Sequence, residues 1–159
     1  MRYPVLPLCL FTLLLAACGE TGNPGLRLNE VCGKDSTTGD WIEIYNASST
    51  PFRLGGHYLL KTDEDGIDHI LHTFPDTVLD PGSCYVVTRL GGSLERKISR
   101  TKEVGVELVA PNDKTVDSFY RDDDVGDSPH PVGGSYARVP DGTGPWIIAD
   151  RSTPGKPNS

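Results

Sequence analysis

Positive charge is scarce in this chain of 159 residues. Lysine and arginine number 15 against 22 aspartates and glutamates, so the formal net charge at pH 7 is −7. A protein that binds nucleic acid mainly through phosphate charge needs a basic face. The charge balance therefore argues against DNA or RNA as the main partner.

The short motifs of common enzymes and zinc sites are absent as well. The sequence has no Gly-x-Ser-x-Gly nucleophile elbow, no His-Glu-x-x-His and no Cys-x-x-Cys. No histidine is patterned near Cys32 or Cys84 to activate either thiol. The sequence therefore predicts a protein that is not an enzyme, although four histidines and many serines leave a spatial triad open.

Long hydrophobic runs are missing except at the start of the chain. Val5 to Leu15 is apolar apart from Pro7 and Thr12, and it follows the positive charge of Arg2. About twenty apolar residues are needed to span a bilayer, so this run is too short for a lasting transmembrane helix. It predicts the hydrophobic core of a secretory signal. Its prolines argue against the alternative, a buried N-terminal helix.

The run ends in Leu15-Ala16-Ala17-Cys18, which resembles the lipobox of bacterial lipoproteins. The resemblance implies a signal peptide over residues 1–17, cleavage before Cys18 and attachment of acyl chains such as palmitate to that cysteine. Residues 18–25 then form a short tether, and the protein is anchored to the cell envelope on its extracytoplasmic side. Gly19 is not the aspartate that retains some lipoproteins at the inner membrane, which favours the outer membrane.

The cysteine count follows from that cleavage. Cys9 leaves with the signal and Cys18 is acylated, so Cys32 and Cys84 remain in a compartment where disulfides persist. We predict a bridge between these two residues, which would stabilise the fold by roughly 3–4 kcal/mol on a chain-entropy basis. The alternative is two unrelated buried thiols.

Turn-forming residues are plentiful, with 18 glycines and 13 prolines. Short β-type runs alternate with turn signals such as Asp65-Gly66 and Asp141-Gly142, which predicts a single antiparallel β-sandwich of about seven to nine strands. Only residues 93–99 are plausible as a helix, of one or two turns. The expected strands are 26–31, 41–45, 57–61, 67–74, 83–88, 104–109, 115–120, 135–139 and 146–149.

Several short segments resemble the lamin tail domain family in its bacterial branch. Six landmarks occur in the family's order, and together with the closing segment they extend over residues 26–158. They are Leu28-Asn29-Glu30-Val31, Asp40-Trp41-Ile42-Glu43-Ile44-Tyr45-Asn46, Leu54-Gly55-Gly56-His57-Tyr58-Leu59, Phe74-Pro75 with Leu79-Asp80-Pro81-Gly82, Val116-Asp117, and Ser135 to Gly142 with Trp146, followed by Thr153-Pro154-Gly155-Lys156-Pro157-Asn158. His57 replaces the family's usual aromatic residue, and residues 91–102 match no landmark.

The resemblance implies an immunoglobulin-like domain over residues 26–159, used as a surface or periplasmic module. The family offers no catalytic residues to carry over. Its matched residues are interpreted as structural, with Asn46 and the glycines in turns. Glu30 and Glu43 are acidic residues inside strand segments, and they face either solvent or a buried arginine. We favour a structural ion pair, for example with Arg138.

Acidic loops raise the question of calcium, because hard cations need oxygen ligands. Two loops qualify, and neither fits the EF-hand pattern. Asp122, Asp123, Asp124 and Asp127 are the candidate ligands in the stronger loop, and residues 63–68 form the weaker one. The alternative is that both loops are solvated turns.

Zinc is less favoured. His69 and His72 are three apart, which on a strand sends the two rings to opposite faces, one packed and one exposed. His130 lies between two prolines and is interpreted as a loop residue.

Basic residues cluster at one place in the chain. Five positive residues could meet anionic glycans, the lipid surface beside the anchor or solvent alone: Arg89, Arg96, Lys97, Arg100 and Lys102. The leading hypothesis is a lipid-anchored, non-catalytic envelope module for adhesion, assembly or binding of a protein or glycan partner, without a cofactor. The alternative is a calcium-dependent ligand-binding or glycan-binding domain.

Overall fold

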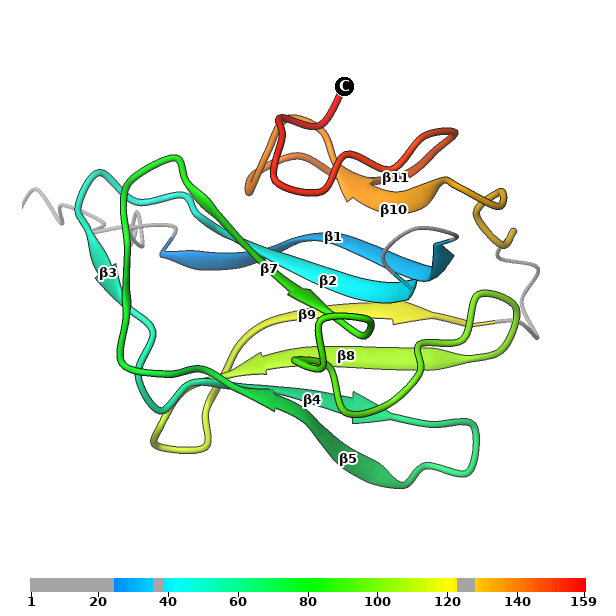
Figure 1. Cartoon of the computed structure of the whole chain (residues 1–159), viewed down its shortest axis with the longest axis horizontal. Coiled ribbons are helices and arrows are strands. Elements are labelled where there is room, and N and C mark those ends of the chain that lie inside the picture. Colours follow the sequence, from blue (N-terminus) through cyan, green and yellow to red (C-terminus); the bar gives the residue numbers. More distant parts are fainter. Residues whose placement is uncertain (1–24, 36–38, 123–127) are drawn as a thin grey trace, which may run out of the picture.

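The chain folds as two antiparallel β-sheets packed face to face (Figure 1). The computed structural model describes residues 25–35, 39–122 and 128–159. The first sheet has the order β11 (Trp146–Ala149), β10 (Ser135–Arg138), β1 (Leu26–Asp35), β2 (Gly39–Asn46), β7 (Cys84–Thr88). The second has the order β5 (Asp68–Thr73), β4 (Tyr58–Thr62), β8 (Val104–Val109), β9 (Thr115–Arg121), and a two-stranded ribbon pairs β3 (Phe52–Arg53) with β6 (Val78–Leu79).

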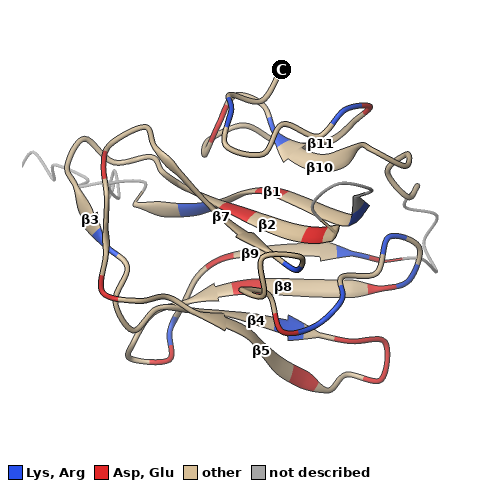
Figure 2. Ribbon diagram, viewed as in Figure 1, with Lys and Arg blue, Asp and Glu red and all other residues tan. Residues whose placement is uncertain are grey.

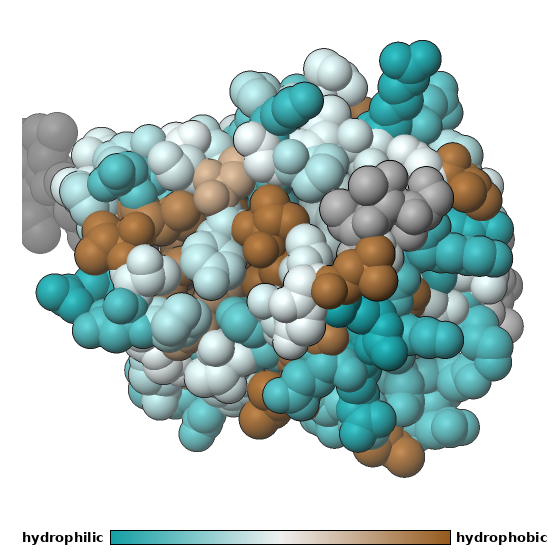
Figure 3. Space-filling model, viewed as in Figure 1, coloured by the Kyte–Doolittle hydropathy of each residue, from teal (hydrophilic) through white to brown (hydrophobic). Residues whose placement is uncertain are grey.

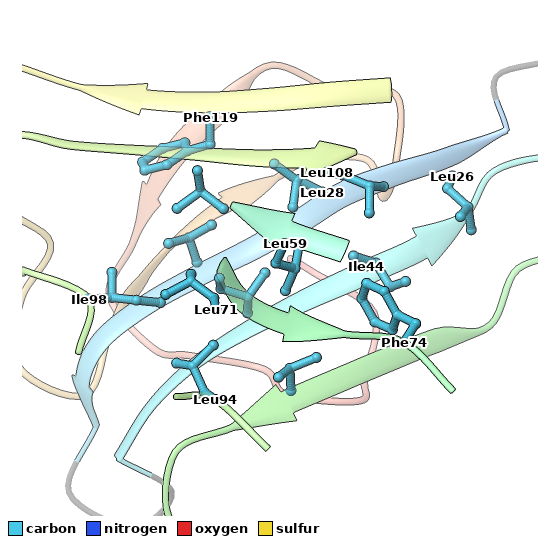
Figure 4. Close-up of a cluster of buried hydrophobic side chains, with 14 of the residues drawn as sticks. Leu26, Leu28, Ile44, Leu59, Leu71, Phe74, Leu94, Ile98, Leu108 and Phe119 are labelled. Atoms are coloured by element: carbon cyan, nitrogen blue, oxygen red, sulfur yellow. The ribbon is translucent and has the colours of Figure 1, made fainter. Parts of the chain in front are cut away.

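The hydrophobic core lies between the two sheets (Figure 4). Leu28 and Ile44 project into it from the first sheet, and Leu59 and Leu108 from the second; all four are 0% exposed. Alternation of apolar and polar residues puts one face of each strand into this core, and burial of each such side chain contributes about 1.5–3 kcal/mol. The predicted immunoglobulin-like sandwich is confirmed, with eleven strands in the described residues instead of seven to nine.

The part of the chain described by the structure contains no helix, and hence none that could cross a membrane. The expected helix over residues 93–99 is wrong. Leu94 and Ile98 have helical spacing, yet they are buried in the core by an irregular segment between β7 and β8. Glu95 N–H donates to the Leu71 carbonyl (2.9 Å) and Ile98 N–H to the Asp40 carboxylate (2.8 Å). In a helix the Ile98 N–H would pair with the Leu94 carbonyl and the Glu95 N–H would have no partner within the helix, whereas here long-range acceptors satisfy both groups.

The expected disulfide is also wrong, since neither Cys32 nor Cys84 forms a disulfide bond. Cys32 is opposite Trp41 on one side of β2, and Cys84 is opposite Tyr45 on the other side. Two strand spacings, about 10 Å, separate β1 from β7 before the four-residue offset along β2 is added. Disulfide-bonded cysteines have Cα atoms about 4.4–6.8 Å apart, so no bridge fits this register.

Candidate functional site

A pair of buried glutamates lies on the outer face of the first sheet, away from the core. Glu30 of β1 and Glu43 of β2 are direct cross-strand partners, and both are 0% exposed. We call them the carboxylate pair. The segment after β11, here called the C-terminal tail (residues 152–158), lies over this side of the sheet (Figure 1). Buried charges require partners, and the tail provides them.

Glu30 is held from two parts of the chain. Its carboxylate accepts hydrogen bonds from the Ser135 hydroxyl on β10 and from the backbone N–H and the hydroxyl of Thr153 in the tail (2.9 and 3.0 Å). Burial raises the pKa of Glu30 above its ordinary value, although these hydrogen bonds oppose the rise. The carboxyl therefore fixes the tail against β1 and β10.

Glu43 makes the same kind of connection one strand further along the sheet. It accepts hydrogen bonds from the Asn29 amide (2.8 Å), from the Gly155 backbone N–H (2.7 Å) and from the Cys84 thiol. Burial is the main reason that the pKa of Glu43 is raised. The pKa of the Cys84 thiol is raised strongly by burial and by the neighbouring carboxylate, so Cys84 is a poor nucleophile at neutral pH.

Asn158 closes the tail over the sheet. Its side-chain amide donates to the Asn29 and Arg138 carbonyls (3.2 and 3.0 Å), and its backbone N–H donates to Asp141 (3.1 Å). The side-chain oxygen of Asn29 accepts a hydrogen bond from the Gly142 N–H (2.7 Å). Gly142 has φ +65°, and a Cβ there would lie 2.5 Å from the Tyr45 ring, so only glycine fits.

Arg138 does not pair with either buried glutamate, so the expected ion pair is wrong. Its guanidinium bonds Asp117 of β9 (3.2 Å), donates to the carbonyls of Leu28 and Gly144, and lies 4.7 Å from the centre of the Trp146 ring. Arg138 thus joins the two sheets, while the glutamates join the first sheet to the tail. The two acidic strand residues are structural as expected, but through hydrogen bonds rather than an ion pair.

His57 takes the place of the aromatic residue that the sequence led us to expect. It is 8% exposed, its Nδ1 hydrogen-bonds with the Leu54 carbonyl (3.1 Å), and its ring packs edge-on against Phe52. The histidine ring therefore serves as the packing group of this turn.

The basic cluster is partly used within the domain. Arg100 donates to the His130 carbonyl (2.7 Å), Arg89 to the Glu95 carbonyl (3.4 Å), and Lys102 pairs with Glu64 (2.6 Å). Arg96 and Lys97 are exposed. Figure 2 shows acidic residues in the β4–β5 loop near the basic β7–β8 loop, so the cluster does not form an isolated positive surface.

Of the four predicted calcium ligands, one lies in the part of the chain that the structure describes. Asp122 is half-buried just after β9, whereas Asp123, Asp124 and Asp127 lie outside the described residues. In the weaker loop, the Asp63 carboxylate accepts hydrogen bonds from the backbone N–H groups of Ile67 and Asp65, and these bonds lower its pKa. The same carboxylate contacts the His69 ring (2.8 Å).

The histidines do not meet at a metal either. His69 and His72 hold different groups, since the His72 ring bonds the Ser93 carbonyl (2.8 Å), and both rings are half-buried rather than one packed and one exposed. His130 is a loop residue as expected, yet it is fully buried and accepts the Gly33 N–H (3.1 Å). Within the described ranges, no group of three or more histidine, cysteine, aspartate or glutamate residues is placed to hold a metal ion.

These observations define the class of the protein, an immunoglobulin-like β-sandwich whose buried polar residues hold its own C-terminus. The family profile of the Lamin Tail Domain matches residues 20–123, and the chain belongs to this family. Membership indicates a non-catalytic immunoglobulin-like module. A search of curated proteins found no match. Beyond the matched range, β10 pairs with β1, so residues after 123 complete the same sheet.

Proposed function

We propose that this protein is a lipid-anchored, non-catalytic module of a bacterial cell envelope that binds a protein partner. One observation carries the non-catalytic part. Asn29, Glu30 and Glu43, which belong to the family-like segments, are buried under the C-terminal tail, where their hydrogen bonds go to the tail and neighbouring strands. Figure 3 shows the hydrophobic residues of one face as small separate patches, which suits a domain whose core is closed.

The anchoring part is supported by the lipobox-like segment and by the position of the first strand. β1 begins at Leu26, so an anchor at Cys18 connects to the sandwich through a tether that spans at most about 25 Å. The C-terminal half of the β7–β8 loop lies at the opposite end of the sandwich (Figure 1). The basic residues Arg100 and Lys102 would therefore face away from the membrane, not the lipid surface beside the anchor.

The anchor is tested by mass spectrometry of the full chain expressed in a bacterium with a lipoprotein pathway. We expect loss of residues 1–17, a diacylglyceryl adduct with added acyl chain on Cys18, and recovery in the membrane fraction. Cys18→Ser should remain uncleaved and unacylated. Recovery of the native chain with an unmodified Cys18 would contradict the anchor, and turnover of an envelope substrate abolished by one substitution would contradict the non-catalytic role.

A further inference from the structure

The outer face of the second sheet contains a hollow centred on Gly105 of β8. Gly105 pairs across the sheet with Thr62 of β4 on one side and with Tyr120 of β9 on the other. Side chains alternate along a strand, so Glu103 and Glu107 lie on the same outward side as Gly105. These five residues and Ser118 contribute to the wall of a hollow of about 240 Å³. We call it the Gly105 hollow.

The fold does not require a glycine at this position. Gly105 does not have a positive φ, and a Cβ built on it would lie 3.5 Å from the Thr62 Cβ and 3.7 Å from the Tyr120 ring, which are ordinary contacts. Glycine inside a strand weakens it and often marks a place where another group approaches the backbone. The missing side chain therefore costs stability and keeps the hollow open.

Tyr120 presents an aromatic surface at the edge of this hollow. The residue lies on the edge strand β9, opposite Gly105, and is 59% exposed. Its hydroxyl donates to Glu103 Oε1 (2.6 Å), which restrains the ring at the hollow. An ordered, exposed aromatic ring is a surface on which a planar or cationic group can stack.

The two glutamates leave negative charge at the hollow. Glu107 accepts a hydrogen bond from the Thr115 hydroxyl (2.6 Å), and Glu103 accepts one from the Tyr120 hydroxyl. Among the described residues, no lysine or arginine nitrogen is within 4.0 Å of either carboxylate. A neutral ligand such as a saccharide would leave these charges uncompensated, whereas a cation would complement them.

We propose that the Gly105 hollow binds an arginine side chain in a basic segment of a partner protein, which makes the outer face of the second sheet the partner-binding surface. A guanidinium can stack on an aromatic ring while its N–H groups donate to a carboxylate, a combination that an ammonium group cannot match. This inference rests on the proposed function, because it names the chemistry of the partner in that role.

The test is an NMR titration of the full chain, isotopically labelled and held in detergent, with the probe acetyl-Gly-Arg-Gly-amide. The matched control peptide replaces arginine by citrulline, which is planar and of similar shape but uncharged. We expect saturable shifts of the Gly105 and Tyr120 amide signals with the arginine peptide, and affinity at least tenfold weaker for citrulline. Equal responses to both peptides, or arginine-induced shifts that avoid these residues, would overturn the proposal.

Two variants separate binding from folding. Gly105→Val fills the hollow and should abolish the shifts while the melting temperature stays unchanged or rises, because valine favours strands. Glu107→Gln removes one charge and should weaken binding at least tenfold. Asp80→Asn removes an exposed carboxylate elsewhere and should bind as the native chain does. Native binding by both hollow variants, or a response to neutral oligosaccharides alone, would refute the arginine site.

The NMR titration and the lipidation assay test the two proposals separately, so a negative result in one leaves the other proposal standing. A correctly acylated Cys18 without a response to arginine would overturn the Gly105 hollow and leave the anchor standing. An arginine response at Gly105 in a chain that is never acylated would support the hollow and contradict the anchored function.

Discussion

The buried glutamates Glu30 and Glu43 are the distinctive residues of this protein, and each has hydrogen-bond partners that explain its position. The carboxylate pair lies side by side across β1 and β2, in a region that burial keeps poor in water. Each glutamate compensates for its desolvation by accepting several hydrogen bonds, some from the C-terminal tail and some from neighbouring strands. In the sequence, two such glutamates resemble a catalytic acid–base pair. Only their surroundings in the structure show that they stabilise the fold.

The raised pKa of Glu43 predicts a measurable pH dependence. A carboxyl whose pKa in the fold exceeds its ordinary value near 4.5 binds more protons when folded. Its contribution is fully present below 4.5 and is lost as pH rises through the raised value. For each unit of elevation, Glu43→Gln should remove about 1.4 kcal/mol of this change in unfolding free energy. Denaturant unfolding from pH 4.5 to 7 measures it.

The native chain and Glu43→Gln must be compared as a pair in that experiment. His72 and His130 have lowered pKa values because of burial, so they reduce stability as pH falls through about 6.5, opposite to the glutamates. Both proteins share these histidines, and the difference between their curves isolates Glu43. Asp80→Asn is the exposed-carboxylate control. Parallel curves for the native chain and Glu43→Gln would contradict the prediction.

The two thiols give a second prediction at this scale. Because β2 separates Cys32 from Cys84, we expect both to react with a maleimide in the denatured protein without prior reduction. Mass spectrometry of the cleaved and acylated chain, which lacks Cys9 and has Cys18 blocked, should count two adducts, and a reductant should leave the melting temperature unchanged. A chain that takes up label only after reduction would restore the disulfide and require a different register.

At the level of elements, the C-terminal tail behaves as part of the first sheet although it is not a strand. Its backbone N–H groups at Thr153, Gly155 and Asn158 donate to carboxylates that project from the sheet or from the turn after β10. A second connection, Arg138 to Asp117, joins that sheet to β9. The sandwich is therefore closed by side-chain bonds as well as by its hydrophobic core.

Removing residues 152–159 should destabilise the domain strongly. Truncation removes three hydrogen-bond donors to the carboxylate pair, two from Thr153 and one from Gly155, and each such bond contributes about 1 kcal/mol to stability. We expect a loss of about 3 kcal/mol in unfolding free energy, a large part of the stability of an ordinary domain. Deletion of Ser159 alone, which is exposed, is the control. Equal denaturant midpoints for the two truncations would show that the tail contributes nothing.

For the whole molecule, the elements at its two ends suggest an orientation for the proposed anchored state. β1 starts at one end, while the β4–β5 loop and the later part of the β7–β8 loop lie at the other (Figures 1 and 2). An anchor before β1 would hold those charged loops away from the membrane. The outer face of the second sheet, with the Gly105 hollow, would stand to the side and remain open to a partner.

Calcium distinguishes the proposed function from its alternative. The arginine-binding module should show no change in melting temperature between calcium and a chelator. A bound ion at a hundredfold excess over its dissociation constant would instead add about 2.7 kcal/mol and raise the midpoint by several degrees. Such a shift, abolished by Asp122→Asn, would favour calcium-dependent ligand binding instead.

The sequence by itself determined the fold class, because alternation, turn residues and the lamin-tail segments are local signals that a single antiparallel sandwich satisfies. Each long strand was predicted within a few residues of its bounds. β3 and β6 were not, since two residues carry no periodicity. The helix predicted over residues 93–99 was wrong because the helical spacing of Leu94 and Ile98 also fits an irregular segment that covers the core.

Only the tertiary structure decided which residues meet. The partners of Glu30, Glu43 and Arg138 lie up to 123 positions away in the chain, so no local pattern could pair them. The strand order put β2 between the two cysteines and excluded their bridge. The same order placed Tyr120 beside Gly105 and opened the hollow. Sequence fixes which groups a strand carries, and pairing across the sheet fixes what they touch.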